Sequence, residues 1–186
     1  MRNISVFCSV LFSIANAAVG ASAEETHVLP IPKNHEQALI NAFEIMCNLE
    51  PPNLDRLAER ATAMRMQPQD VAPLNLPSNL TLRRKAWNGK LTTGPFSFLV
   101  DETSGPMGTI TTCAIASSVP DVNAFRGEVM RELRLSTEPQ PTFLGGHRAF
   151  IFKNFQGDGS GLVIEDLTPS GQPSVMIKLS SLKKSN

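Results

Sequence analysis

Two segments in the first half of the chain repeat apolar side chains every three or four positions, the period of a helix with one buried face. The first spans 35–49, and the second follows Asn53. Their apolar positions are Leu39, Ala42, Phe43, Met46 and Cys47, then Leu54, Leu57, Ala58, Ala61 and Met64. Asn34 and Asn53 are residue types that cap helices. Pro51 and Pro52 end the first helix.

From residue 81 onward the pattern changes to short apolar runs, many of them alternating with polar residues, as in strands. The predicted strands are 81–87, 96–100, 109–117, 146–155, 162–167 and 174–179. Asn88-Gly89 is a strong turn signal, so we expect a hairpin there. Pro120 and Asp121 begin a third helix, with a stripe of Val122, Phe125, Val129 and Leu133. The proline-containing segment 67–80 is predicted to be a loop.

The order of these elements predicts an α+β fold. Short turns between strands indicate a mainly antiparallel sheet, here of five to six strands. Three amphipathic helices must bury their stripes on it, so the order ααββ(β)αβββ predicts a two-layer sandwich. We find no internal repeat in the sequence. We expect one domain over 34–182, with an extended arm at 24–33 before it and a polar tail at 183–186 after it.

Residues 1–23 have the order of a secretory signal peptide: a positive start at Arg2, an apolar run over 4–14, and small residues up to Ala23. The run is shorter than the roughly 20 apolar residues that span a bilayer, so we expect cleavage. Cleavage is expected between Ala23 and Glu24, with cleavage after Ala17 as the alternative. The mature chain is therefore expected to be periplasmic or secreted, without insertion in a membrane.

The expected location determines which oxidation state we predict for the cysteines. Cys8 leaves with the signal peptide, and Cys47 and Cys113 remain. In an oxidising compartment an even pair of cysteines usually forms a disulfide. The alternative is two buried free thiols that pack as small apolar side chains. We expect the disulfide, which would join the first helix to the strand at 109–117.

Charge argues against nucleic acid as a partner. The chain has 17 basic and 17 acidic side chains, no Tyr and one Trp. A near-neutral chain has no field that gathers nucleic acid or anionic membrane, and it offers few rings for base stacking.

One basic cluster stands out, Arg83-Arg84-Lys85 followed by Trp87. On a strand Arg83 and Lys85 face one side and Arg84 the other, which is typical of charges that protect a sheet edge. The alternative is a docking site for an acidic partner or a polyanionic glycan, with Trp87 as its anchor rather than as a core residue.

No motif in the mature part specifies a reaction. His27, His35 and His147 lack the spacing of metal ligands. The glycine-rich segment 157–161 is typical of a turn. Adjacent carboxylates, Asp101-Glu102 and Glu165-Asp166, would point to opposite faces of a strand and make no acid–base pair. We therefore predict no catalytic residue, cofactor or metal.

The chain resembles small exported bacterial proteins of unknown function. The resemblance lies in a helix with Phe43 and Cys47, a second with Leu57 and Ala61, then Trp87 and Cys113. It implies export and the cysteine pair, and it brings no activity. The sequence thus favours an exported, non-catalytic protein that binds a protein partner. The alternatives are a small-molecule or lipid carrier with an apolar cavity, and an enzyme whose site is assembled from distant residues.

Overall fold

The structure is a computed structural model, and it describes residues 31–184 apart from 73, 75, 137–140 and 169–171. The predicted signal peptide and most of the predicted arm lie outside the described residues. No helix within the described part combines the length and the apolar character that crossing a membrane requires.

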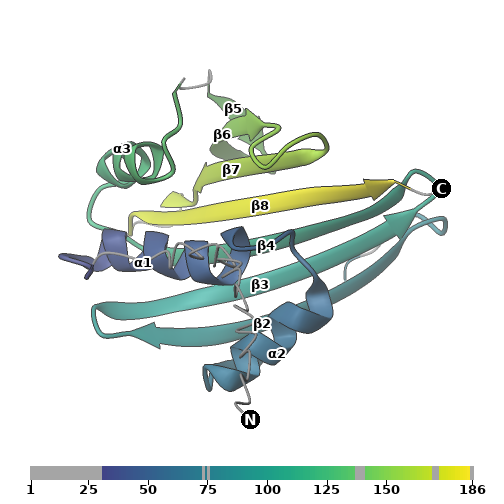
Figure 1. Ribbon diagram of the computed structural model, residues 1–186, viewed down its shortest axis with the longest axis horizontal. Coiled ribbons are helices and arrows are strands. Elements are labelled where there is room, and N and C mark those ends of the chain that lie inside the picture. Colours follow the sequence, from purple (N-terminus) through teal and green to yellow (C-terminus); the bar gives the residue numbers. More distant parts are fainter. Residues whose placement is uncertain (1–30, 73, 75, 137–140, 169–171, 185–186) are drawn as a thin grey trace, which may run out of the picture.

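The described strands form one antiparallel sheet of eight, in the order β1-β2-β3-β4-β8-β7-β6-β5 (Figure 1). Their bounds are β1 Gln67–Gln69, β2 Thr81–Leu91, β3 Gly94–Gly105, β4 Gly108–Ser118, β5 Thr142–Leu144, β6 His147–Lys153, β7 Ser160–Asp166 and β8 Ser174–Lys184. The final strand thus includes Lys183 and Lys184, the first residues of the predicted polar tail.

The helices begin where the sequence indicates. They are α1 His35–Phe43, which continues as a π-helical turn η1 Glu44–Asn48, α2 Leu54–Ala63 and α3 Val122–Glu132. Asn34 Oδ1 accepts a hydrogen bond from the Gln37 amide at 2.9 Å, and Asn53 caps α2 in the same way. Asp121 caps α3. Each cap satisfies amide groups that the first turn of a helix leaves without partners.

The helices pack on one face of the sheet (Figure 1), and the core lies between these two layers. The strand register places one row of apolar residues across that face: Phe98, Ile115, Ile177, Ile164 and Phe150. All of them are buried. The expected disulfide between Cys47 and Cys113 is confirmed, with a Cα–Cα distance of 5.5 Å. It ties η1 to β4 through the core.

The prediction of five to six strands was wrong, because the sheet has eight. The two strands that were missed are β1, inside the segment predicted as a loop, and β5. Each has three residues, and the residues of β1 are all exposed. A strand this short carries no alternation that a sequence pattern could reveal, and it forms because a longer neighbour offers backbone partners.

The hairpin turn predicted at Asn88-Gly89 was also wrong. β2 continues to Leu91, and the chain turns at 92–93. A Cβ atom at Gly89 would lie 2.2 Å from Cζ of Phe96, so the ring occupies the space of the missing side chain. The glycine serves packing within the sheet rather than a turn.

The two halves of the sheet have a similar order of elements, which the sequence does not show. β1 to β4 form one four-stranded meander and β5 to β8 form another, and β4 pairs with β8 where they meet. A helical segment precedes each meander, and a three-residue strand begins each. The two outer edges of the sheet therefore have similar construction: a long strand, only partly paired with a short one.

Candidate functional site

The sequence leaves two roles open for Trp87, the anchor of a docking site or a member of the core. In the structure its side chain faces the helices. It is 5% exposed, and its ring stacks on that of Phe98 with centroids 5.4 Å apart. Trp87 is therefore a core side chain in this structure.

The two arginines of the basic cluster are paired on opposite faces of β2. Arg83 donates to Asp55 at 2.6 Å and to Glu102 at 3.0 Å. The hydrogen bond to Asp55, and then that to Glu102, raises the pKa of Arg83 above its ordinary value. On the other face Arg84 donates to both oxygens of Asp101, each at 2.6 Å, which raises the pKa of Arg84.

Lys85 differs from both arginines. It is exposed, and it forms no ion pair with any residue that the structure describes. Of the three cations in the cluster, Lys85 therefore contributes a positive charge that is not balanced by a neighbouring carboxylate. The charge available to a partner is smaller than the sequence suggests.

Beside this part of β2 lies a groove of about 430 Å³, whose lining combines apolar side chains with exposed polar atoms. We call it the β2 groove; its lining residues are Val71, Ala72, Leu74, Leu76, Leu80, Leu82 and Arg84. Val71 is 37% exposed, Leu74 51% and Leu76 36%. Apolar side chains gathered on a surface in this way mark sites of interaction more often than scattered ones do.

β2 pairs with β3 on its inner side, but its outer edge has no described strand beside it along the same groove. β1 pairs only with Ala86–Asn88, so no described strand lies outside Thr81–Lys85. Pro68 lies opposite Trp87 and has no N–H, so the hydrogen-bonded positions of β2 are Ala86 and Asn88. Because such positions alternate along a strand, the N–H and C=O groups of Leu82 and Arg84 also point outward.

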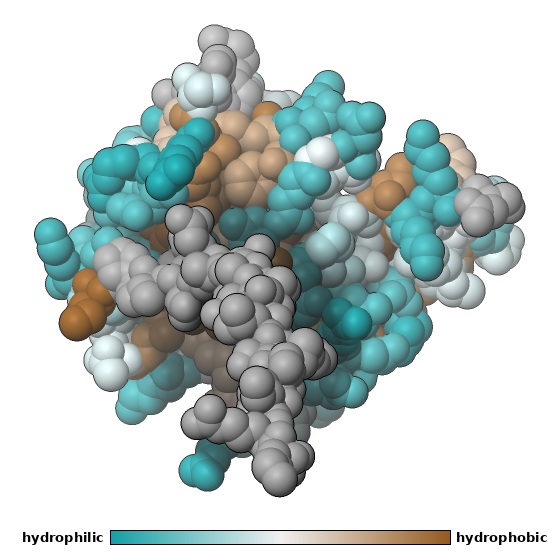
Figure 2. All heavy atoms as spheres, viewed as in Figure 1, coloured by the Kyte–Doolittle hydropathy of each residue, from teal (hydrophilic) through white to brown (hydrophobic). Residues whose placement is uncertain are grey.

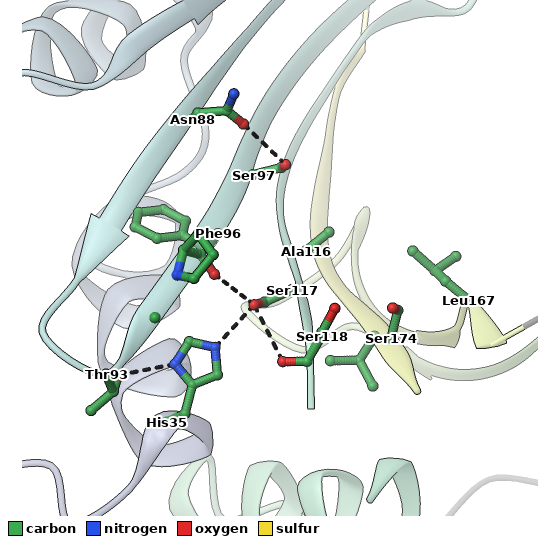
Figure 3. A pocket seen from close by; sticks show the side chains of 13 residues that line it. His35, Asn88, Thr93, Phe96, Ser97, Ala116, Ser117, Ser118, Leu167 and Ser174 are labelled. Carbon is green, nitrogen blue, oxygen red and sulfur yellow. Dashed lines mark hydrogen bonds between the residues drawn. The ribbon is translucent and has the colours of Figure 1, made fainter. Parts of the chain in front are cut away.

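A second cavity, of about 560 Å³, lies at the end of the sheet where α1 begins (Figure 3). His35 crosses it: Nδ1 lies 2.9 Å from Thr93 Oγ1, and Nε2 lies 3.0 Å from Ser117 Oγ. Ser117 donates its single proton to the carbonyl oxygen of Pro95 at 2.7 Å. With that proton directed at Pro95, Nε2 of His35 is the donor to Ser117, and in the neutral imidazole Nδ1 would accept from Thr93.

This direction of hydrogen bonding is the reverse of what a nucleophilic serine requires. Such a serine gives its proton to the imidazole, which a third group orients. Here Ser117 receives a hydrogen bond from His35, and no carboxylate is among the described residues that line the cavity. The arrangement ties the start of α1 to β4 and to the β2–β3 turn.

Most of the other residues considered from the sequence have structural partners; the exception is His147, at the start of β6, whose Nδ1 is buried and has no hydrogen-bond partner among the described residues. Ser160 Oγ, in the glycine-rich turn, accepts from the Gln156 amide and donates to the Gly157 carbonyl. Glu165 pairs with Lys178. Within the described residues, no three His, Cys, Asp or Glu side chains are grouped as metal ligands would be. His27 lies outside the described residues.

The sequence pattern indicated a candidate docking site at the basic cluster, and it did not predict the β2 groove next to that cluster. A signal was present: Val71, Leu74 and Leu76 are apolar residues in a proline-containing segment that has no helical or strand period. Apolar residues grouped in a loop are typical of a surface that contacts another molecule.

Comparison with protein-family models, with curated proteins and with solved structures gives no match to this chain. The geometry of the β2 groove is therefore the basis for a functional proposal.

Proposed function

We propose that this protein is an exported, non-catalytic module that binds another protein at the β2 groove. The observation that carries the proposal is a groove with exposed Val71, Leu74 and Leu76 beside the outer edge of β2, where no described strand pairs with it. Sheet edges with free N–H and C=O groups accept extended segments of a partner as an added strand.

The groove also indicates how such a partner would be recognised. Leu82 and Arg84 offer main-chain hydrogen bonds, and their side chains lie on the face of the sheet away from the helices. Side chains of an added strand alternate between the two faces. Apolar residues of the partner would enter the groove on one face, and an acidic residue would lie near Lys85 on the other.

Two observations support binding of a protein rather than catalysis or carriage of a small molecule. The hydrogen bonds of His35 and Ser117 run against nucleophilic catalysis, as described above. A carrier buries most of its ligand in a concave apolar site. Here the space between the helices and the sheet is filled by packed side chains such as Phe43, Phe98 and Phe125.

The experiment is site-specific photocrosslinking in the exporting host. A photoreactive phenylalanine analogue replaces Leu74 in one variant and Met107 in the other. Met107 is 84% exposed on a different turn, and Leu74 is 51% exposed. We expect a discrete protein adduct from position 74 and none from position 107.

A second arm tests the groove by substitution. The double variant Leu74→Ser, Leu76→Ser should keep its melting temperature, because exposed sites contribute little to stability. It should also lose the crosslinked partner from affinity capture, whereas Met107→Ser should retain it. Equal recovery of the partner by both variants would contradict the proposal.

A further inference from the structure

The second outer edge of the sheet repeats the features of the first. β5 pairs with His147–Ala149 and with no other part of β6. Gly145 and Gly146, with φ of 57° and 89°, make the two-residue turn that closes this hairpin. In such a hairpin the residues that flank the turn bond to each other. His147 and every second residue after it, including Ile151 and Lys153, therefore direct N–H and C=O toward the outer edge.

No described strand lies beside Ile151 and Lys153 on that side. Between this part of β6 and the end of α3 is a groove of about 440 Å³. Its apolar wall consists of Leu133, Leu135, Phe152 and Phe155, which also pack against the core. Figure 2 shows apolar surface in the region between α3 and the β6–β7 hairpin.

Positive charge surrounds this groove. Arg134 and Lys153 line it, and neither has an ion-pair partner among the described residues. Farther along the same margin, the guanidinium groups of Arg126 and Arg148 lie 4.2 Å and 5.1 Å from the ring centroid of Phe150. Glu128 and Glu132 of α3 both pair with Arg131, and neither forms an ion pair with Arg134, Lys153 or Arg148.

An exposed aromatic side chain completes the margin. Phe143, on β5, is 74% exposed and lies opposite Arg148 in the strand register. A large exposed ring beside arginines is typical of protein contacts, in which aromatic residues and Arg are enriched.

We propose that this margin, formed by α3, β5 and the outer edge of β6, is a second docking surface. It takes an extended, acidic segment of a protein partner as a strand added to β6. Main-chain bonds to Ile151 and Lys153 give the segment its register, apolar side chains enter the groove on the helix face, and the alternating carboxylates face Lys153 on the other side of the sheet. Arg134 and Arg148, on the helix face, add positive charge along the margin. The unpaired backbone favours a polypeptide over nucleic acid or a membrane, which would use the cations alone. These observations are separate from those at the β2 groove, and the two edges together would let one molecule hold two segments.

The test uses the disulfide-bonded protein and a synthetic peptide with alternating Glu and Leu. Its matched controls are a peptide with Lys in place of Glu, and the acidic peptide with N-methylated alternate amides. Amide NMR signals report binding residue by residue. We expect saturable shifts at Ile151 and Lys153 with the acidic peptide, and much smaller shifts with both controls.

Two protein variants make the test specific. Lys153→Glu should weaken binding of the acidic peptide by at least about fivefold, because close charges across an interface are coupled. Lys90→Glu, at an exposed lysine on β2, should leave binding unchanged. The Leu74→Ser, Leu76→Ser variant should also bind the peptide normally, so failure of the β2 groove and failure of this margin can be told apart. The proposal is overturned if the basic peptide binds as well, if N-methylation has no effect, or if the shifts fall at Thr81–Lys85 instead.

Discussion

Gly89 is buried in β2 because the ring of Phe96 lies where a side chain would be. Gly127, in α3, has no atom within 4 Å of the position of a Cβ. The two glycines should therefore respond to alanine in opposite ways. Gly89→Ala should destabilise the protein by about 1–3 kcal/mol through overpacking. Gly127→Ala should stabilise it by roughly 0.5–1 kcal/mol through helix propensity.

Urea unfolding of both variants measures the difference. Combining Gly89→Ala with Phe96→Leu should recover part of the loss, because the smaller side chain removes the ring from the new methyl group. An unchanged midpoint for Gly89→Ala alone would show that the ring is not held in that position.

Trp87 and Lys85 are two residues apart on the same strand and should differ sharply in stability. Trp87→Ala removes a buried ring from its stack on Phe98 and should cost about 3–5 kcal/mol. Lys85→Ala changes an exposed side chain and should move the free energy of unfolding by less than about 0.5 kcal/mol. Chemical denaturation followed by circular dichroism checks both. A small loss for Trp87→Ala would argue for a surface role after all.

At the scale of elements, the disulfide between η1 and β4 is the strongest single link between the helical layer and the sheet. It closes a loop with a sequence separation of 66 residues. The double variant Cys47→Ala, Cys113→Ala should lose about 2–5 kcal/mol of stability. Reducing agent should destabilise the wild type by a similar amount and leave the variant unaffected. A response of the variant to reductant would mean that another thiol reaction is being measured.

The long elements could be predicted from the sequence and the short ones could not. Three helices and six long strands have enough residues to show their apolar period. β1 and β5 form only because β2 and β6 present backbone partners. Gly89 belongs to an Asn-Gly pair that is typical of turns, but its role depends on the ring of Phe96, which reaches it only when β2 and β3 pair. The candidate sites were less predictable still, since His35 and Ser117 are separated by 82 residues and the β2 groove exists only once the loop meets its strand.

At the scale of the whole molecule, the sheet consists of two meanders joined by the β4–β8 pair. β8 also pairs with β7, so its removal would separate the two meanders. A chain that ends at residue 173 should expose the edges of β4 and β7 and self-associate, as unprotected edges do. Size-exclusion chromatography of this truncation should show aggregates, whereas a folded monomer would contradict the prediction. Its Cys47–Cys113 disulfide should still form, because both cysteines precede β5.

The central position of β8 also sets an order of events in time. A ribosome makes this strand last of the eight, and a translocated chain would deliver it last. The first meander and its disulfide can assemble early from residues close in sequence, but the seam between the meanders waits for the final strand. Contacts between distant parts of a chain form slowly. Until β8 is added, β4 and β7 each have an unpaired edge at the centre of the nascent molecule. A chaperone or a protease would bind this incomplete form most readily.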